Sequence, residues 1–157
     1  MGMFEVMAGG TRYLQPADLD AADIVVPLEN RVPAALGQTV TVLACTWSDF
    51  GPPPEGFEMF LRDRVIPLLW EGRRLLVYCI GSHGRTGTFL ASLIALLESS
   101  EETPDPIAAA RARHCHKAVE TLAQAESVFA LRGQPLPEKY RREFAPAVRG
   151  VGLPFGA

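Results

Sequence analysis

Long apolar runs and an excess of charge of one sign are both missing from this sequence. Its longest apolar stretch, from Phe89 to Leu97, is interrupted by Ser92 and falls well short of the roughly 20 residues that a membrane-spanning helix needs. A net charge of −3 gives no general attraction to nucleic acid or membrane surfaces. The first residues lack the basic segment and the apolar core of a signal peptide. The composition therefore predicts a cytoplasmic protein without a nucleic-acid or membrane partner.

Cysteine is also scarce. The three cysteines, Cys45, Cys79 and Cys115, are odd in number and widely spaced, which does not fit a disulfide framework and suits a reducing compartment. A chain of 157 residues with ordinary hydrophobic and charged fractions is long enough to bury a substantial core. We therefore expect a single domain over residues 1–157, in which residues 134–157 form a short helix and a loose tail.

Short apolar segments alternate with helical patterns in the first part of the chain, and helices dominate the rest. Apolar and β-branched runs predict strands at 24–28, 39–44 and 75–79. Apolar residues at helical spacing predict helices at 55–70, 86–98, 105–116 and 119–131. Pro67 should bend or shorten the first of these helices. This order favours an α/β layer with a helical cap.

The most informative segment runs from Cys79 to Gly87 and directly follows an apolar run. A strand, a glycine-rich turn and a helix start together form an anion-binding cradle, because backbone N–H groups and the positive end of the helix dipole converge there. A cysteine in that position is stabilised as a thiolate. Arg85 adds a planar pair of donors that fits two phosphoryl oxygens. The predicted phosphate site comprises Ile80, Gly81, Ser82, His83, Gly84 and Arg85.

A structural cysteine or a nucleotide-binding loop could also give a segment of this kind. A buried structural cysteine is common, but it would not require the glycines and the arginine that follow Cys79. The phosphate loop of nucleotide-binding proteins requires Gly-Lys-Ser/Thr, whereas this chain has Gly84-Arg85-Thr86. The segment therefore predicts a nucleophilic thiolate inside a phosphate site.

Attack of a thiolate on phosphorus expels an alkoxide or phenoxide, which needs a proton from a nearby acid. Asp49 is the best candidate, because it follows a predicted strand and lies between Trp47 and Phe50. Both aromatic side chains are expected to pack the loop down and exclude water. Taken alone, such an aspartate is more often a turn or helix-cap residue.

The motifs resemble those of the cysteine-dependent protein tyrosine phosphatase superfamily. The Cys-x5-Arg-Ser/Thr signature is matched by residues 79–86, and the Trp-Pro-Asp-x-x-x-Pro acid loop by residues 47–53, with Ser48 in place of proline. Residues 120–124 are similar to the family's Gln-Thr-x-x-Gln loop. The short chain looks like the compact dual-specificity group, which includes small bacterial and phage members.

The resemblance implies a small central, mostly parallel sheet flanked by helices, and a reaction in two steps. Cys79 would attack phosphorus while Arg85 and the loop amides hold the phosphoryl oxygens. Asp49 would protonate the leaving oxygen and then act as the base for water. Thr86 would hydrogen-bond the sulfur, and Gln124 would position the water. No metal ion or cofactor is implied.

The chain departs from the family pattern at three informative positions. Tyr78 replaces the histidine that precedes the nucleophile. Glu120 stands where the first glutamine of the third motif would be. Because a carboxylate repels phosphate, Glu120 is expected to point away or to pack against Arg111 or Arg113. His83 lies inside the cradle, either on its solvated rim or against the flank of the substrate.

Two further groups carry weaker signals. His114-Cys115-His116 suggests a metal site, but zinc sites use four ligands, and the only other histidine, His83, lies in the cradle. No metal site is therefore expected. Cys45 is a candidate for a reversible disulfide with Cys79, as in some members of the family.

The resulting prediction is a phosphatase acting on phosphotyrosine in phosphorylated proteins or peptides, with phosphoserine and phosphothreonine as further substrates. A phosphoinositide or RNA 5′-phosphatase on the same scaffold is the alternative, although lipid-directed members usually carry lysine between the positions of Cys79 and Arg85, and this chain has none there. A phosphate-binding pseudophosphatase is a non-enzymatic alternative. Such proteins usually lose the cysteine, the arginine or the acid, and this chain keeps all three.

Overall fold

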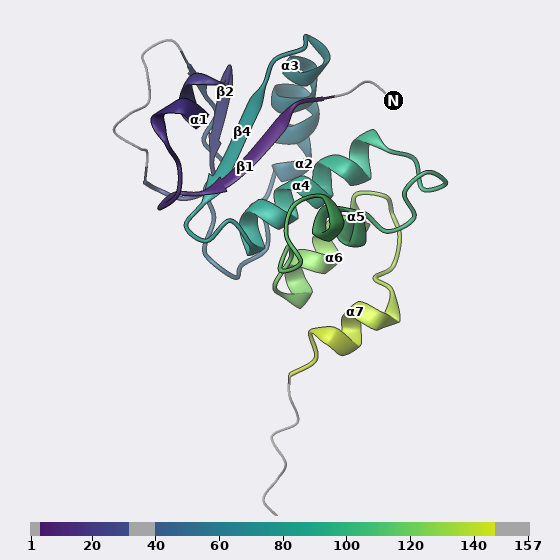
Figure 1. The fold of residues 1–157 in the computed structure, drawn as a ribbon. Helices are drawn as coiled ribbons and strands as arrows, with labels where there is room; N and C mark the ends of the chain where they lie inside the picture. The colour runs from purple at the N-terminus through teal and green to yellow at the C-terminus, as the bar shows by residue number, and fades with distance from the viewer. Residues whose placement is uncertain (1–3, 32–39, 147–157) are drawn as a thin grey trace, which may run out of the picture.

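A computed structural model describes residues 4–31 and 40–146 of the chain. Its centre is a parallel sheet of four strands in the order β1-β4-β2-β3 (Figure 1). The strands are β1 (Val6–Gly10), β2 (Ile24–Pro27), β3 (Thr41–Val42) and β4 (Leu75–Cys79). The sheet and its helices confirm the predicted α/β class.

Strand β4 lies between β1 and β2, and all five of its residues are buried. Its apolar run suits this place, since a central parallel strand is covered on both faces. Leu75, Val77 and Cys79 join the core formed with the helices on one face. Leu76 and Tyr78 join a smaller core on the other face. The carboxyl end of β4 therefore delivers Cys79 to the edge of the sheet where the loops begin.

Strand β1 and the short helix α1 (Pro16–Asp20) are elements that the sequence pattern did not predict. Two of the five residues of β1 are glycines, which weaken any strand signal. The strand forms because it pairs with β4 and brings Gly10 beside Cys79. A Cβ atom on Gly10 would lie 3.0 Å from the carbonyl oxygen of Ile80, so this glycine allows the two backbones to approach.

The predicted helix at 55–70 is continuous but contains a π-helical turn. It consists of α2 (Phe57–Phe60), the π-turn η1 (Leu61–Val65) and α3 (Ile66–Trp70). Across the π-turn, the N–H of Ile66 donates to the oxygen of Leu61. Pro67 has no N–H to donate, and a local π-turn is one way for a helix to pass a proline without ending. Pro67, which was expected to bend or shorten the helix, therefore does not end it, and the π-turn precedes the proline.

Four further helices lie in the described part of the chain: α4 (Gly84–Leu97), α5 (Pro106–Arg113), α6 (Leu122–Ala130) and α7 (Glu138–Glu143). Helix α4 lies between the sheet and the other three (Figure 1). Helix α6 starts later than predicted because Thr121 caps it, its Oγ1 accepting the N–H of Gln124 at 3.3 Å. Among the described residues, no helix combines the length and the apolar character needed to cross a bilayer.

Helix α7 occupies part of the segment expected to hold a short helix, and it is tied to α5 through Asp105. This carboxylate caps α5 by accepting the N–H of Ala108 at 2.9 Å. It also accepts the Tyr140 hydroxyl at 2.7 Å and pairs with Lys139 at 2.5 Å. Burial opposes the ionisation of Asp105, but these hydrogen bonds together lower its pKa. The tail expected after α7, residues 147–157, lies outside the described residues.

We predict that Asp105→Ala lowers the free energy of unfolding by about 1–2 kcal/mol, the upper range for a lost helix cap. Folding lowers the pKa of Asp105. Its negative charge therefore stabilises the fold fully at pH values above about 4, the pKa of an aspartate in the unfolded chain. This contribution is lost as the pH falls further. Asp105→Asn keeps a capping oxygen and should lose less stability than wild type between pH 7 and pH 3. Urea unfolding at both pH values checks this. Equal acid sensitivity of Asp105→Asn and wild type would contradict it.

Candidate active site

The candidate nucleophile lies at the carboxyl end of β4, where the chain turns toward α4. Cys79 is only 3% exposed. Its Sγ accepts a hydrogen bond from the Thr86 Oγ1 at 3.0 Å. Thr86 is on the first turn of α4 and is fully buried. The structure thus brings together the two residues for which the sequence predicted this contact.

The loop from Cys79 to α4 carries unpaired backbone donors. Within the described part of the chain, the N–H groups of Gly81, Ser82 and His83 have neither a backbone nor a side-chain acceptor. Helix α4 starts at the next residue, Gly84, and the first N–H groups of a helix have no partner inside the helix. A run of such donors at a helix start is suited to binding an anion.

Arg85 is anchored at one end of its guanidinium group and unpartnered at the other. The residue is 5% exposed, and its Nη1 donates to the Trp47 oxygen at 2.9 Å and to the Leu28 oxygen at 3.4 Å. Its Nε is buried without a hydrogen-bond partner among the described residues. The Asp49 Oδ1 lies 3.6 Å from this Nε, close enough for an ion pair but too far for a hydrogen bond. A buried unpaired donor on a cation favours a bound anion.

The glycines of the motif allow a second loop to approach α4. A Cβ atom on Gly87 would lie 2.5 Å from the Cα of Ala118. A Cβ atom on Gly84 would lie 2.7 Å from the Glu120 Oε2. The two glycines therefore admit residues 118–120 against the start of the helix, beside the candidate phosphate site.

The loop that carries Asp49 is held by Trp47. The indole is buried and packs edge-on against Phe57 at 5.4 Å between ring centroids. Its Nε1 donates to the Gly51 oxygen at 3.0 Å and closes the loop. The expectation that both aromatic residues pack the loop down holds for Trp47 only, because Phe50 has a positive φ of 62° and is 60% exposed. The Asp49 side chain is half exposed at the surface of the site.

Gln124 joins the Asp49 loop to the start of α6. The side chain is fully buried. Its Oε1 accepts the Glu120 N–H at 2.9 Å, and its Nε2 donates to the Gly51 oxygen at 3.1 Å. The role in positioning water stays a prediction. In this conformation both ends of the amide hold backbone groups, one of them in the Asp49 loop.

Glu120 does not point away from the site, contrary to the expectation from its charge. Its carboxylate lies against Gly84 at the start of α4. Burial raises its pKa, and the negative charge of Asp49 raises it further, against the opposing influence of nearby cations. Two carboxylates, Asp49 and Glu120, therefore face the candidate phosphate site. The resemblance to the third motif identified Glu120 as a residue near the site. The orientation expected for it from repulsion by phosphate was wrong.

The two arginines proposed as partners of Glu120 are engaged elsewhere. Arg111 donates to the oxygens of Ala118 and Val119 and pairs with Glu143 at 2.8 Å. Arg113 pairs with Glu98 at 2.5 Å. The arginines thus support the loop and the helices rather than neutralise Glu120.

Tyr78 and Cys45 are both buried, and neither takes part in the candidate site. The Tyr78 hydroxyl donates to the Arg31 oxygen at 3.0 Å, and burial raises its pKa to about 12. Tyr78 faces the side of the sheet opposite to Cys79. Burial raises the pKa of Cys45 to about 11, so this thiol is a poor nucleophile at neutral pH. The disulfide suggested between Cys45 and Cys79 stays a prediction.

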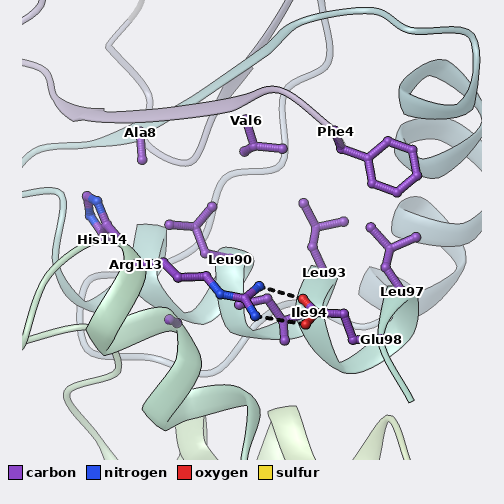
Figure 2. A pocket seen from close by; sticks show the side chains of 11 residues that line it. Phe4, Val6, Ala8, Leu90, Leu93, Ile94, Leu97, Glu98, Arg113 and His114 are labelled. Carbon is purple, nitrogen blue, oxygen red and sulfur yellow. Dashed lines mark hydrogen bonds and ion pairs between the residues drawn. The ribbon is translucent and has the colours of Figure 1, made fainter. Parts of the chain in front are cut away.

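The larger of two hollows in the described part of the chain is not lined by Cys79. It has a volume of about 510 Å³ and lies between β1, α4 and α5. Figure 2 shows its apolar side chains with the Arg113–Glu98 ion pair beside them and His114 at one end. The smaller hollow, of about 350 Å³, is lined by Arg85, Trp47 and Glu29 among others. Arg85 connects the smaller hollow to the candidate site, whereas Cys79, Asp49 and residues 80–84 do not line it.

Comparison with other sequences finds relatives over part of the chain. No protein-family model matches it. Two uncharacterized proteins of Methanocaldococcus jannaschii are 46% and 45% identical to it over 81 residues, which is 52% of this chain. The matched part covers 52% and 48% of their lengths. The chain thus spans about half the length of the curated relatives it matches.

Solved structures of several phosphatases have a similar fold. The active form of Tk-PTP has a TM-score of 0.68 and 22% identity, covering 83% of this chain and 92% of that one. PTPMT1 in complex with PI(5)P has a TM-score of 0.62 and 17% identity, covering 82% and 90%. Kinase associated phosphatase, with serine in place of its catalytic cysteine, has a TM-score of 0.59 and 17% identity, covering 89% and 86%. The chain has the fold of the cysteine-dependent protein tyrosine phosphatase superfamily, which confirms the predicted fold.

Proposed function

We propose that this protein is a cysteine-dependent phosphatase that hydrolyses phosphotyrosine in proteins or peptides. The observation that carries the proposal is Arg85, whose buried Nε has no hydrogen-bond partner among the described residues while its Nη1 is fixed to the Trp47 backbone. A guanidinium held in this way next to a hydrogen-bonded thiol is arranged for an oxyanion at a reacting phosphorus. The fold shared with known phosphatases supports the same assignment.

In the first step, the Cys79 sulfur attacks phosphorus and the bond from phosphorus to the ester oxygen breaks. Arg85 and the amides of residues 80–84 hold the phosphoryl oxygens as their charge is redistributed. Asp49 gives its proton to the leaving oxygen. The products are a phosphocysteine and a free phenol or alcohol.

In the second step, water attacks the phosphocysteine and the sulfur–phosphorus bond breaks. The carboxylate of Asp49 accepts a proton from the water and returns to its starting state. Thr86 Oγ1, at 3.0 Å from the sulfur, donates to the thiolate as it leaves. The phosphate is then released, and no metal ion takes part in either step.

The surroundings of the site favour a phosphotyrosine residue over a phosphoinositide. The Glu120 carboxylate lies against Gly84 of the cradle, and a carboxylate there repels the additional phosphate of a phosphoinositide headgroup. The exposed ring of Phe50 stands next to Asp49, where it can pack against the aryl ring of a substrate. A related fold does hold PI(5)P in the PTPMT1 structure, so a phosphoinositide is the second candidate substrate.

The proposal is tested by phosphate release from matched substrates at equal phosphate concentration. We expect kcat/KM for a phosphotyrosine peptide to exceed the values for a phosphoserine peptide, PI(5)P and a 5′-phosphorylated RNA by about tenfold or more. Addition of EDTA should leave the rate unchanged. A preference for PI(5)P would change the proposed substrate class to phosphoinositides but leave the proposed reaction unchanged. No phosphate release from any ester would overturn the proposed function.

A further inference from the structure

Two residues that the proposed chemistry does not use, His114 and Cys115, contact the phosphate loop from the end of α5. The His114 Nε2 lies 2.7 Å from the carbonyl oxygen of Ser82 and 3.2 Å from its Oγ. The Cys115 Sγ lies 3.2 Å from the Nδ1 of His83. Two consecutive loop residues are therefore held by two consecutive residues from another part of the chain.

Ser82 is the residue of the loop that most needs such support. Its φ is +59°, which lies in the left-handed region that residues other than glycine rarely adopt. A backbone conformation of this kind persists when its surroundings hold it. Here the Nε2 atom of His114 contacts the carbonyl oxygen of Ser82 directly.

The same contact sets the direction of an N–H group in the loop. In a trans peptide, the C=O of one residue and the N–H of the next point to opposite sides. The Ser82 oxygen faces His114. The N–H of His83 is therefore directed to the opposite side, and it has no acceptor among the described residues.

The segment that makes these contacts is itself well fixed. The N–H of His114 donates to the Ala110 oxygen at 2.9 Å and ends α5. The N–H of Ala118 donates to the Cys115 oxygen at 2.9 Å, and the N–H of Lys117 lies 3.4 Å from the Cys115 Sγ. Such a turn, hydrogen-bonded at both ends, can hold the phosphate loop without moving with it.

We infer that His114 is a positioning residue for phosphate binding: by donating from Nε2 to the Ser82 carbonyl, it keeps the His83 N–H directed at the phosphoryl oxygens. The inference rests on the proposed function of the loop. Cys115 supports the same arrangement through its contact with the His83 ring at 3.2 Å. His114 does not touch the substrate, and its effect passes through the Ser82–His83 peptide.

The test compares His114→Ala with His114→Gln and with the control His116→Ala. His116 is exposed and two residues away, so its removal should change nothing. For His114→Ala we expect kcat/KM for an aryl phosphate to fall about 100-fold, the loss associated with misplacement by about 1 Å. The inhibition constant of inorganic phosphate should rise in parallel. His114→Gln retains an N–H donor and should recover part of both.

Melting temperatures show whether the variants fold. If His114→Ala does not fold, Ser82→Gly serves instead, because glycine lets the same peptide rotate without strain, and it should raise the inhibition constant of phosphate. A folded His114→Ala variant with wild-type kcat/KM and phosphate affinity would overturn the inference and leave the proposed function standing. Phosphate binding that depends on His114 in a wild-type protein that hydrolyses no ester would support the inference and overturn the function.

Discussion

The Cys79→Ser variant is expected to release no measurable phosphate from an aryl phosphate while its fold stays intact. A serine hydroxyl at this position stays protonated at neutral pH and is a much weaker nucleophile than a cysteine thiolate. The Thr86 hydroxyl, which contacts the sulfur at 3.0 Å, cannot make the serine hydroxyl ionise. Removal of a catalytic nucleophile lowers turnover by as much as roughly 10⁶-fold. Initial rates of aryl phosphate hydrolysis, together with the melting temperature, check this result.

The same variant should still bind phosphotyrosine peptides, because Arg85 and the loop amides are unchanged. This makes it a trap with which bound peptides can be recovered and identified. Cys45→Ala is the matched control, since Cys45 is also a buried free cysteine but is not a residue of the phosphate loop. Retention of half of the wild-type rate by Cys79→Ser would refute the assignment of the nucleophile.

Replacing Asp49 by alanine should lower turnover by roughly 10²–10⁴-fold, the usual contribution of general acid–base catalysis. The reduction should be largest for esters whose leaving groups are strongly basic, because these need a proton most. Rates for a series of aryl and alkyl phosphates measure this dependence. Asp63→Asn, an exposed carboxylate on η1, provides the control and should behave like wild type.

A near-normal rate of Asp49→Ala for all leaving groups would mean that another acid serves. Glu120 is the group to examine in that case, because burial raises its pKa and its carboxylate lies at the start of α4. The double variant Asp49→Ala/Glu120→Gln then shows whether Glu120 supplies the proton when Asp49 is absent. A further loss in the double variant alone would assign the proton transfer to Glu120.

The parts of the fold that could be predicted are those in which a local pattern matches the final environment. β4 is an uninterrupted apolar run, and it lies at the centre of the sheet with both faces covered. β1 could not be predicted, because its glycines weaken the pattern and its pairing with β4 spans about 70 residues of sequence. The π-turn before Pro67 likewise depends on packing that keeps the helix continuous.

The same distinction applies to the site. Cys79, Arg85 and Thr86 lie in one loop and the helix start that follows it, so their spacing fixes their relative positions. Glu120 and His114 reach the cradle from loops 30 or more residues away, and the direction of their side chains depends on how α5 and α6 pack. Repulsion by a bound phosphate would turn Glu120 outward, whereas close packing against Gly84 decides its orientation.

The hydrogen bond from the Arg85 Nη1 to the Trp47 oxygen, at 2.9 Å, joins the group that would bind the anion to the loop that would deliver the proton. Displacement of that loop would remove the nearer of the two acceptors that fix the guanidinium. Closure of the loop therefore strengthens anion binding, and anion binding favours closure of the loop by the same free energy. Substitutions that loosen the loop without touching the cradle, such as Trp47→Phe, which removes the indole donor to Gly51, should consequently weaken product inhibition as well as turnover.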